Sequence, residues 1–287
     1  MSTNSTGTIR LFFLIFIFIL AACHPKNLER VTTPSVHPPT ATHTTVPTQT
    51  AAQTNTPTPT ISPTPRPIFT VCCPLEDETI QSLPLILANP LKIPPHFGQD
   101  TGHHGVDFAY FQRGERESIE GIEIYAIMAG KIVLALTEND LPYGYMVMIE
   151  TPLSHLPEEL QELLLAGYQP VPEDPNYRLY CPEVSSPVVT GEFSVYHLYA
   201  HMKEPPAFHF SEPINCGQTL GIVGNTGYSS SPHLHLETRL GPSGASFEGL
   251  AHYETAYTPE QMGNYCLWRM SGYFQLFDPF ILLDHIE

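Results

Sequence analysis

Histidine and acidic residues recur in this sequence at spacings that could place them around one metal ion. His233 and His235 alternate with leucines, so in a strand both imidazoles would lie on one face. His103 and Asp107 stand on either side of Gly105, and an extended chain would turn both side chains to the same side, with room for a metal beside the glycine. Imidazole and carboxylate groups bind zinc, and three protein ligands that leave one position for water are typical of a catalytic site. The alternative without a metal is a polar strand face for His233 and His235, and a solvated loop for His103 and Asp107.

A third group of histidines lies in residues 196–202, which alternate in the same way. Alternation places His197 and His201 on one face, and this periodicity does not choose between them. His104 points away from its neighbour and is expected to take no part in the chemistry. Glu237 is expected to be a surface carboxylate at a strand end, and the alternative is a side chain that orients a metal ligand.

These side chains need strands to position them, and residues 69–287 have the short apolar runs between glycine, proline and asparagine that are typical of strands. Connections are too short for repeated βαβ units, so we predict a mainly β domain with an antiparallel sheet and a groove across it. The predicted strands are residues 122–127, 130–136, 145–150, 194–202, 219–223 and 233–239. One helix is predicted from Pro157 to Gly167, within a segment, residues 151–191, that looks inserted between two strands.

The charge balance argues against several classes of partner. The 287 residues carry 12 Lys and Arg against 29 Asp and Glu, a net charge of −17. Such a chain repels phosphate backbones unless it has a local basic patch, and the sequence has none. No nucleic-acid partner is expected.

The N-terminus has the pattern of an export signal. An uninterrupted apolar run, residues 11–22, is too short for a membrane-spanning helix, which needs about 20 residues. The run ends in Leu20-Ala21-Ala22-Cys23, which resembles a bacterial lipobox, so residues 1–22 are predicted to be a lipoprotein signal peptide and Cys23 the lipidated residue. The alternative is an ordinary signal peptide with a chance cysteine. We therefore expect an exported lipoprotein, anchored to a membrane through Cys23 and facing the periplasm or cell wall.

Between this anchor and the folded domain, residues 23–68 are predicted to be a disordered linker. Residues 24–68 contain ten prolines and thirteen threonines, and such a segment cannot bury enough apolar surface to offset its ordering entropy. An extended stalk of this kind would hold the domain away from the lipid surface.

Five cysteines remain for the domain, and they permit two disulfides at most. Cys72 and Cys73 are not expected to pair with each other, because neighbouring Cα atoms lie closer together than a disulfide usually spans. Sequence leaves the pairing among the five open. They are Cys72, Cys73, Cys181, Cys216 and Cys266.

The order of the short motifs is more specific than any one of them. His103-x-Gly-x-Asp107 comes first, then Tyr199-Ala200-His201-Met202, then residues 224–227, Gly-Asn-Thr-Gly, followed by Pro-His-Leu-His at 232–235. This combination resembles the lysostaphin/LytM-type zinc metallopeptidases of peptidase family twenty-three, which cut peptidoglycan cross-bridges. The resemblance covers residues 91–240, and it implies the family's β-groove fold.

Carried over position by position, the resemblance implies that His103, Asp107 and His235 bind Zn²⁺ and that His201 and His233 are the catalytic histidines. It implies a zinc endopeptidase, expected to be a monomer, that hydrolyses peptidoglycan stem or cross-bridge peptides. The alternative is a non-catalytic module of the same fold that binds the cell wall or activates amidases. All five family positions are present, which favours the enzyme.

Two segments depart from the family's compact core: the insertion, residues 151–191, and a long tail, residues 241–276. Because loops beside a β groove commonly set specificity, we hypothesise that the insertion and its helix wall the substrate groove.

Overall fold

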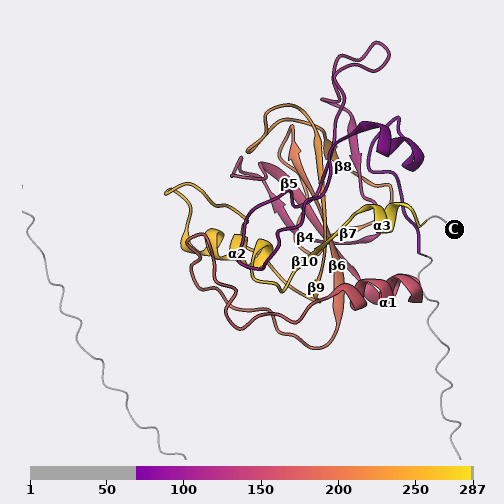
Figure 1. The fold of residues 1–287 in the computed structure, drawn as a ribbon. Coiled ribbons are helices and arrows are strands. Elements are labelled where there is room, and N and C mark those ends of the chain that lie inside the picture. The colour runs from indigo at the N-terminus through magenta and orange to yellow at the C-terminus, as the bar shows by residue number, and fades with distance from the viewer. Residues whose placement is uncertain (1–68, 286–287) are drawn as a thin grey trace, which may run out of the picture. The chain divides into compact units, whose positions relative to one another are not determined.

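Two long strands, β6 (Phe193–Met202) and β9 (Leu234–Pro242), pair side by side at the centre of one antiparallel sheet. The computed structural model describes residues 69–285 and is shown in Figure 1. The predicted signal peptide 1–22, the lipidation site Cys23 and the linker 23–68 lie outside the described residues.

The main sheet has the strand order β1-β2-β9-β6-β5-β4-β7. A further strand, β10, pairs with β9 beyond the point where β2 ends, and β3 and β8 form a separate two-stranded sheet. All the strand pairs are antiparallel, so the predicted mainly β, antiparallel class is confirmed. The remaining strands are β1 (Leu87–Asn89), β2 (Val106–Phe108), β3 (Glu123–Tyr125), β4 (Gly130–Leu136), β5 (Tyr145–Pro152), β7 (Pro213–Ile214), β8 (Thr219–Ile222) and β10 (Gln275–Phe277).

Each face of the main sheet packs against its own hydrophobic core, because side chains alternate along the strands. Tyr199 of β6 and Leu236 of β9 belong to the first core, while Leu198 and Ala200 of β6 belong to the second. Helices α1 (Glu158–Gly167) and α3 (Phe280–Leu283) pack on the first core, and α2 (Pro259–Arg269) packs on the second. Figure 1 shows α2 on one side of the strands and α1 and α3 on the other. Two short 3-10 helices, η1 (Ile80–Ile86) and η2 (Leu153–His155), complete the described elements.

The predicted helix of the insertion is present as α1. Two further helices, α2 and α3, lie outside the insertion and were not predicted. The tail contains α2, and its start has a clear sequence signal. The Thr258 hydroxyl accepts a hydrogen bond from the backbone of Gln261, whose side chain accepts one from the Thr258 backbone in return. Pro259 occupies the first turn, where its missing N–H costs nothing. The inserted segment joins the ends of β5 and β6, as predicted.

Two disulfides link distant segments of the domain. Cys72 pairs with Cys216, and Cys181 of the insertion pairs with Cys266 of α2. Cys73 has a free thiol, so the expectation that Cys72 and Cys73 do not pair is confirmed. Structural disulfides are typical of proteins in oxidising, exported compartments, so this chain has the character of an exported protein.

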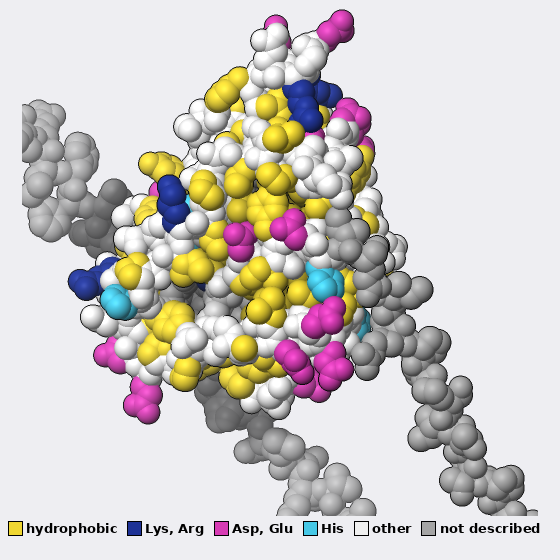
Figure 2. All heavy atoms as spheres, turned by 45° about the vertical axis from the view of Figure 1, so that its right-hand side comes forward, with side chains coloured by type: hydrophobic (Ala, Val, Ile, Leu, Met, Phe, Trp, Pro, Cys, Tyr) yellow, Lys and Arg dark blue, Asp and Glu magenta, His cyan; other side chains and the backbone are white. Residues whose placement is uncertain are grey.

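Over residues 69–285, no helix combines the length and the apolar character needed to cross a membrane. The acidic balance of the sequence is visible on the surface in Figure 2, where carboxylate side chains are scattered among apolar and neutral ones.

Candidate metal centre

Strand register brings Asp107 and His235 together on the second-core face of the sheet. The leucines and hydrophobic residues beside them in β2 and β9 point into the first core, so both polar side chains point the opposite way. Asp107 lies directly across from His235 in the β2–β9 ladder, and His235 lies directly across from Ala200 in the β6–β9 ladder. Cross-strand partners share a face, so the buried Ala200 lies on the same face as these two side chains.

His103 reaches the same place from the loop before β2. Its Nε2 lies 3.0 Å from Asp107 Oδ1, and His235 Nδ1 lies 2.9 Å from the same oxygen. The ligand atoms of these three residues all lie within 4.8 Å of one another. The structure therefore assembles the three predicted zinc ligands into one cluster.

The hydrogen bonds behind this cluster decide which nitrogens face it. His103 Nδ1–H donates to the carbonyl of Pro90 at 3.0 Å, and His235 Nε2–H faces Glu237 Oε2 at 3.4 Å. Because each ring directs one N–H away, the nitrogen lone pairs and the Asp107 carboxylate converge on one point. Two imidazoles and a carboxylate with an open side match the ligand set of a catalytic zinc ion, so the residues present fit this metal.

The pKa shifts of the same groups indicate that the cluster favours positive charge. Burial would raise the pKa of Asp107, but hydrogen bonds from His103 and His235 hold it well below its usual range. Burial would lower the pKa of His235, but its bonds to Asp107 and Glu237 raise it to about 9. Without a metal, a proton supplies the charge between His235 and Asp107, and a metal ion would displace that proton.

Glu237 is not the surface carboxylate that we expected, because its side chain is fully buried (0% exposed). It accepts a hydrogen bond from Tyr143 Oη at 2.9 Å and another from Arg239 Nε at 2.5 Å. Burial would raise its pKa, but the Arg239 guanidinium and the bond from His235 keep it ionised. The geometry matches the alternative role, a carboxylate that fixes the orientation of a ligand imidazole.

His201 reaches the cluster through an irregularity that alternation could not reveal. Because Ala200 shares a face with His235, a regular strand would point the next residue to the opposite face. A bulge intervenes: Tyr145 pairs with Met202 and Val147 with Tyr199, so β6 uses one residue more than β5 over this stretch. His201 itself has φ of 62°, in the left-handed region that costs a histidine backbone energy.

Hydrogen bonds hold His201 in this strained conformation. Its backbone N–H donates to Tyr143 and its carbonyl accepts from Gly224, while its ring Nδ1–H donates to the carbonyl of Thr226 at 2.7 Å. Its ring centre lies 5.8 Å from that of His235 and 4.6 Å from that of His233. Nε2 of His201 is therefore the free nitrogen that faces the cluster.

His233 stands beside His201 with the same arrangement of its ring. Its Nδ1–H donates to the carbonyl of Ser231 at 2.8 Å, and its Nε2 lies 3.5 Å from Asp107 Oδ1. Burial lowers the pKa of His201 to about 3 and also lowers that of His233. Both rings are neutral at pH 7, so each offers a lone pair that can take up a proton.

His197, the other candidate of the same strand, lies away from the cluster. It is fully buried on the first-core face, where its ring nitrogens bond to Thr151 Oγ1 at 3.0 Å and Tyr199 Oη at 2.8 Å. The structure thus places His201, and not His197, beside the predicted ligands.

Gly105 leaves room for a ring rather than for a metal. A Cβ at this position would lie 2.8 Å from Cε1 and Nε2 of His235 and 2.6 Å from the carbonyl of Leu236. The prediction of free space beside the glycine therefore needs correction: the ligand imidazole of β9 packs against its backbone.

The cluster opens into a cavity of about 970 Å³. No residue of the insertion, 151–191, lines it, so the hypothesis that the insertion walls the groove is wrong. The helix α1 of that insertion packs on the opposite face of the sheet, with Leu160 in the first core. The tail contributes Tyr253 and Arg269 instead, and our sequence analysis missed both.

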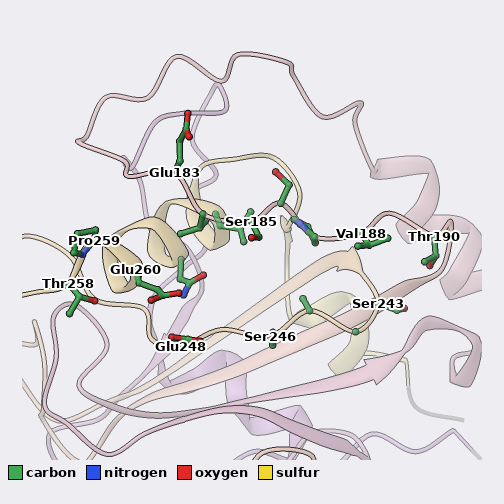
Figure 3. Close-up of a pocket in the computed structure, with 17 residues that line it drawn as sticks. Glu183, Ser185, Val188, Thr190, Ser243, Ser246, Glu248, Thr258, Pro259 and Glu260 are labelled. Carbon is green, nitrogen blue, oxygen red and sulfur yellow. The ribbon is translucent and has the colours of Figure 1, made fainter. Parts of the chain in front are cut away.

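A second cavity, of about 1090 Å³, lies away from these histidines, between residues 183–190 of the insertion and the start of α2 (Figure 3). Its lining is made of serines, threonines, glutamates and small apolar residues, and it contains none of the predicted site residues.

Comparisons with known proteins give a likeness of structure only. No protein-family model matches the chain. No curated protein sequence matches it either. Among solved structures, a Pseudomonas aeruginosa protein described as an M23 peptidase has 16% identity and a TM-score of 0.30, over 76% of this chain and 56% of that one. The present chain thus spans little more than half of that protein.

Two shorter structures are covered more completely. The catalytic domain of lysostaphin, an antimicrobial peptidase from Staphylococcus simulans, has 20% identity and a TM-score of 0.33, over 59% of this chain and 90% of that one. The prophage-encoded M23 protein EnpA from Enterococcus faecalis has 17% identity and a TM-score of 0.31, over 55% and 82%.

Proposed function

We propose that this protein is a zinc-dependent endopeptidase that hydrolyses peptide bonds in peptidoglycan stem or cross-bridge peptides. The observation that carries the proposal is the convergence of the Asp107 carboxylate with the imidazoles of His103 and His235, open toward a cavity that two neutral imidazoles also line. The order of the sequence motifs supports peptidoglycan as the substrate.

His103, Asp107 and His235 would hold the zinc ion. When bound, zinc supplies a Lewis acid that lowers the pKa of a water molecule to about 7 and polarises the scissile carbonyl. The cavity of about 970 Å³ into which the cluster opens leaves room for both water and substrate.

His201 and His233 would move the protons of the reaction. Hydrolysis adds water across the amide bond, so one proton must leave the water and one must reach the departing amine. Each ring presents Nε2 to the cavity while its Nδ1–H is held by a carbonyl, so each can accept a proton at Nε2 and return it from there. A ring protonated in this way also donates a hydrogen bond to negative charge on the carbonyl oxygen.

The N-terminal segments complete the proposal. Lipidation at Cys23 and a linker over residues 23–68 would tether the domain to a membrane, within reach of the cell wall. We propose that one copy acts alone, since a single chain supplies all five predicted site residues.

The test uses the chain without residues 1–22 and with Cys23→Ser, which removes the lipid. It is incubated with purified peptidoglycan, with chelator and after zinc is restored, and the released fragments are read by mass spectrometry. We expect new peptide termini that disappear with chelator and return with zinc.

Three variants separate metal binding from proton transfer. Asp107→Asn should lose zinc and activity together, His201→Ala should keep zinc and lose activity, and the exposed His209→Ala is the matched control. If the folded, zinc-loaded protein releases no fragments from several wall types, the proposed activity is wrong and the non-catalytic module takes its place.

A further inference from the structure

Arg269, at the C-terminal end of α2, lines the cavity of the metal centre although it belongs to the tail outside the motif core. Its side chain is 12% exposed. Nε lies 2.7 Å from Asp100 Oδ1, and Nη1 donates to Tyr143 Oη at 3.4 Å. Nη2 donates no hydrogen bond to any residue of the described domain, 69–285, and it is not one of the fully buried atoms, so its two N–H groups remain free for a ligand in the cavity that Arg269 lines.

Contacts on several sides hold the guanidinium in its position at the cavity. Two aromatic rings flank it, with their centres 5.8 Å from Cζ at Tyr143 and 5.3 Å at Tyr265. Asp100, its ion-pair partner, is fixed in turn, because both Tyr265 and Tyr253 donate hydrogen bonds to its other oxygen. Such a fixed fork loses little entropy when it binds a planar anion.

The position of Arg269 relates it directly to the reacting groups. Tyr143, which accepts from Arg269, donates to Glu237, and Glu237 accepts from the ligand His235. The open donor therefore lies two side chains from the metal ligand, in the same cavity. Carboxylates are the planar groups of a peptide that an arginine fork recognises.

We propose, resting on the proposed peptidase function, that Arg269 binds a free carboxylate of the substrate and so selects peptides with a carboxylate close to the scissile bond. The carboxylate comes from a C-terminus or from an acidic side chain, and both present the same chemistry to Nη2. Arg269 is thus a specificity-determining residue supplied by the tail.

The test compares matched peptides on the zinc-loaded chain with Cys23→Ser. Pentaglycine and a dimer containing D-alanyl-diaminopimelate are each prepared with a free C-terminal acid and with a C-terminal amide. In a second pair of peptides, one has a glutamate near the scissile bond and the other has a glutamine at the same position. This pair shows whether the bound carboxylate belongs to a side chain or to the C-terminus. Both kcat/KM and equilibrium binding by calorimetry are measured.

In one of the peptide pairs, we expect kcat/KM and the binding constant of the acid to exceed those of the uncharged partner by about 10- to 100-fold. A hydrogen bond to a charged group supplies a difference of this size. Arg269→Gln should abolish this ratio mainly through KM, Arg269→Lys should restore part of it, and the exposed Arg116→Gln should leave it unchanged. If Arg269→Gln does not fold, the test rests on the acid-to-amide ratio of the unaltered protein and on the change of that ratio in Arg269→Lys.

The outcomes separate the two proposals. Equal cleavage and equal binding of acid and amide would overturn the role of Arg269 while the peptidase stands. No cleavage of any peptide or wall would refute the peptidase, and calorimetry would still report the carboxylate preference. Absence of binding by every peptide would overturn the inference as well.

Discussion

Replacing Glu237 by glutamine should weaken zinc binding without touching a zinc ligand. The glutamine has the same size, but it replaces a buried charge that accepts from His235, Tyr143 and Arg239. If its amide N–H₂ faces His235 Nε2, the ring favours the tautomer with its proton on Nδ1, which is the nitrogen that must face the metal.

The size of the effect follows from these contacts. Loss of a hydrogen-bonding partner behind a ligand imidazole typically costs 10- to 100-fold in metal affinity, about 1.4–2.7 kcal/mol. Breaking the buried pair with Arg239 should also lower the free energy of unfolding of the metal-free protein by about 3 kcal/mol, because one buried charge loses its partner.

A matched control separates these two effects. Glu150 is also buried, at 2% exposure, and pairs with Lys131 at 3.0 Å, but it does not line the cavity. Glu150→Gln should therefore lower stability while zinc affinity stays within twofold of the unaltered protein. Zinc affinity is measured by competition with a chromophoric chelator, and stability by urea unfolding without metal. The reasoning is refuted if both variants bind zinc equally well, or if both lose the same affinity.

Further predictions concern packing, acid and covalent links. Gly105→Ala should lower zinc affinity at least tenfold in the same competition assay, about the loss typical of a misplaced ligand, whereas Gly167→Ala, with open space around it, should not. Burial lowers the pKa of His197 to about 3, below its unfolded value of about 6.5. The neutral ring therefore contributes to the free energy of unfolding above pH 6.5, and this contribution is lost by about 1.4 kcal/mol per pH unit as the pH falls toward 3. In urea unfolding, His197→Gln should make the free energy of unfolding depend less on pH between about pH 6.5 and 5. An unchanged pH dependence would contradict this. The double variant Cys181→Ser with Cys266→Ser should lower the free energy of unfolding by about 2–5 kcal/mol. A loss below about 0.5 kcal/mol would show that this disulfide does not stabilise the domain.

Sequence reasoning predicts the central sheet well because its strands carry a strong period of two. The strand predicted at residues 130–136 coincides with β4, and α1 begins at Glu158, directly after the predicted Pro157. The start of α2 was also readable, since Thr258 and Gln261 have capping-box spacing. The short runs of β1, β2, β7 and β10 have no such signal, because they form only where longer strands offer an edge.

The site is harder to predict for a different reason. Alternation within one segment predicts that His103 shares a side with Asp107 and that His233 shares a side with His235, and the structure brings all four to one cavity. It treats His197 and His201 alike, however, and the bulge that separates them is a property of the paired strands. The buried Glu237 likewise bonds to Tyr143, and its partner Arg239 bonds to Phe274 of the tail, and both Tyr143 and Phe274 are distant in sequence. Periodicity describes one strand at a time, so contacts made by other segments lie beyond it.

At His201, selection for stability and selection for the proposed chemistry act differently on the side chain. A glycine would adopt φ of 62° without the cost of about 1 kcal/mol that a side chain adds there, but it would lose the hydrogen bond of the ring to Thr226, which is of similar size. Directed evolution for thermal tolerance alone would therefore act on the balance of these two terms and would not protect the side chain that the proposed chemistry needs. Thermostable forms of this domain are best sought with position 201 held fixed.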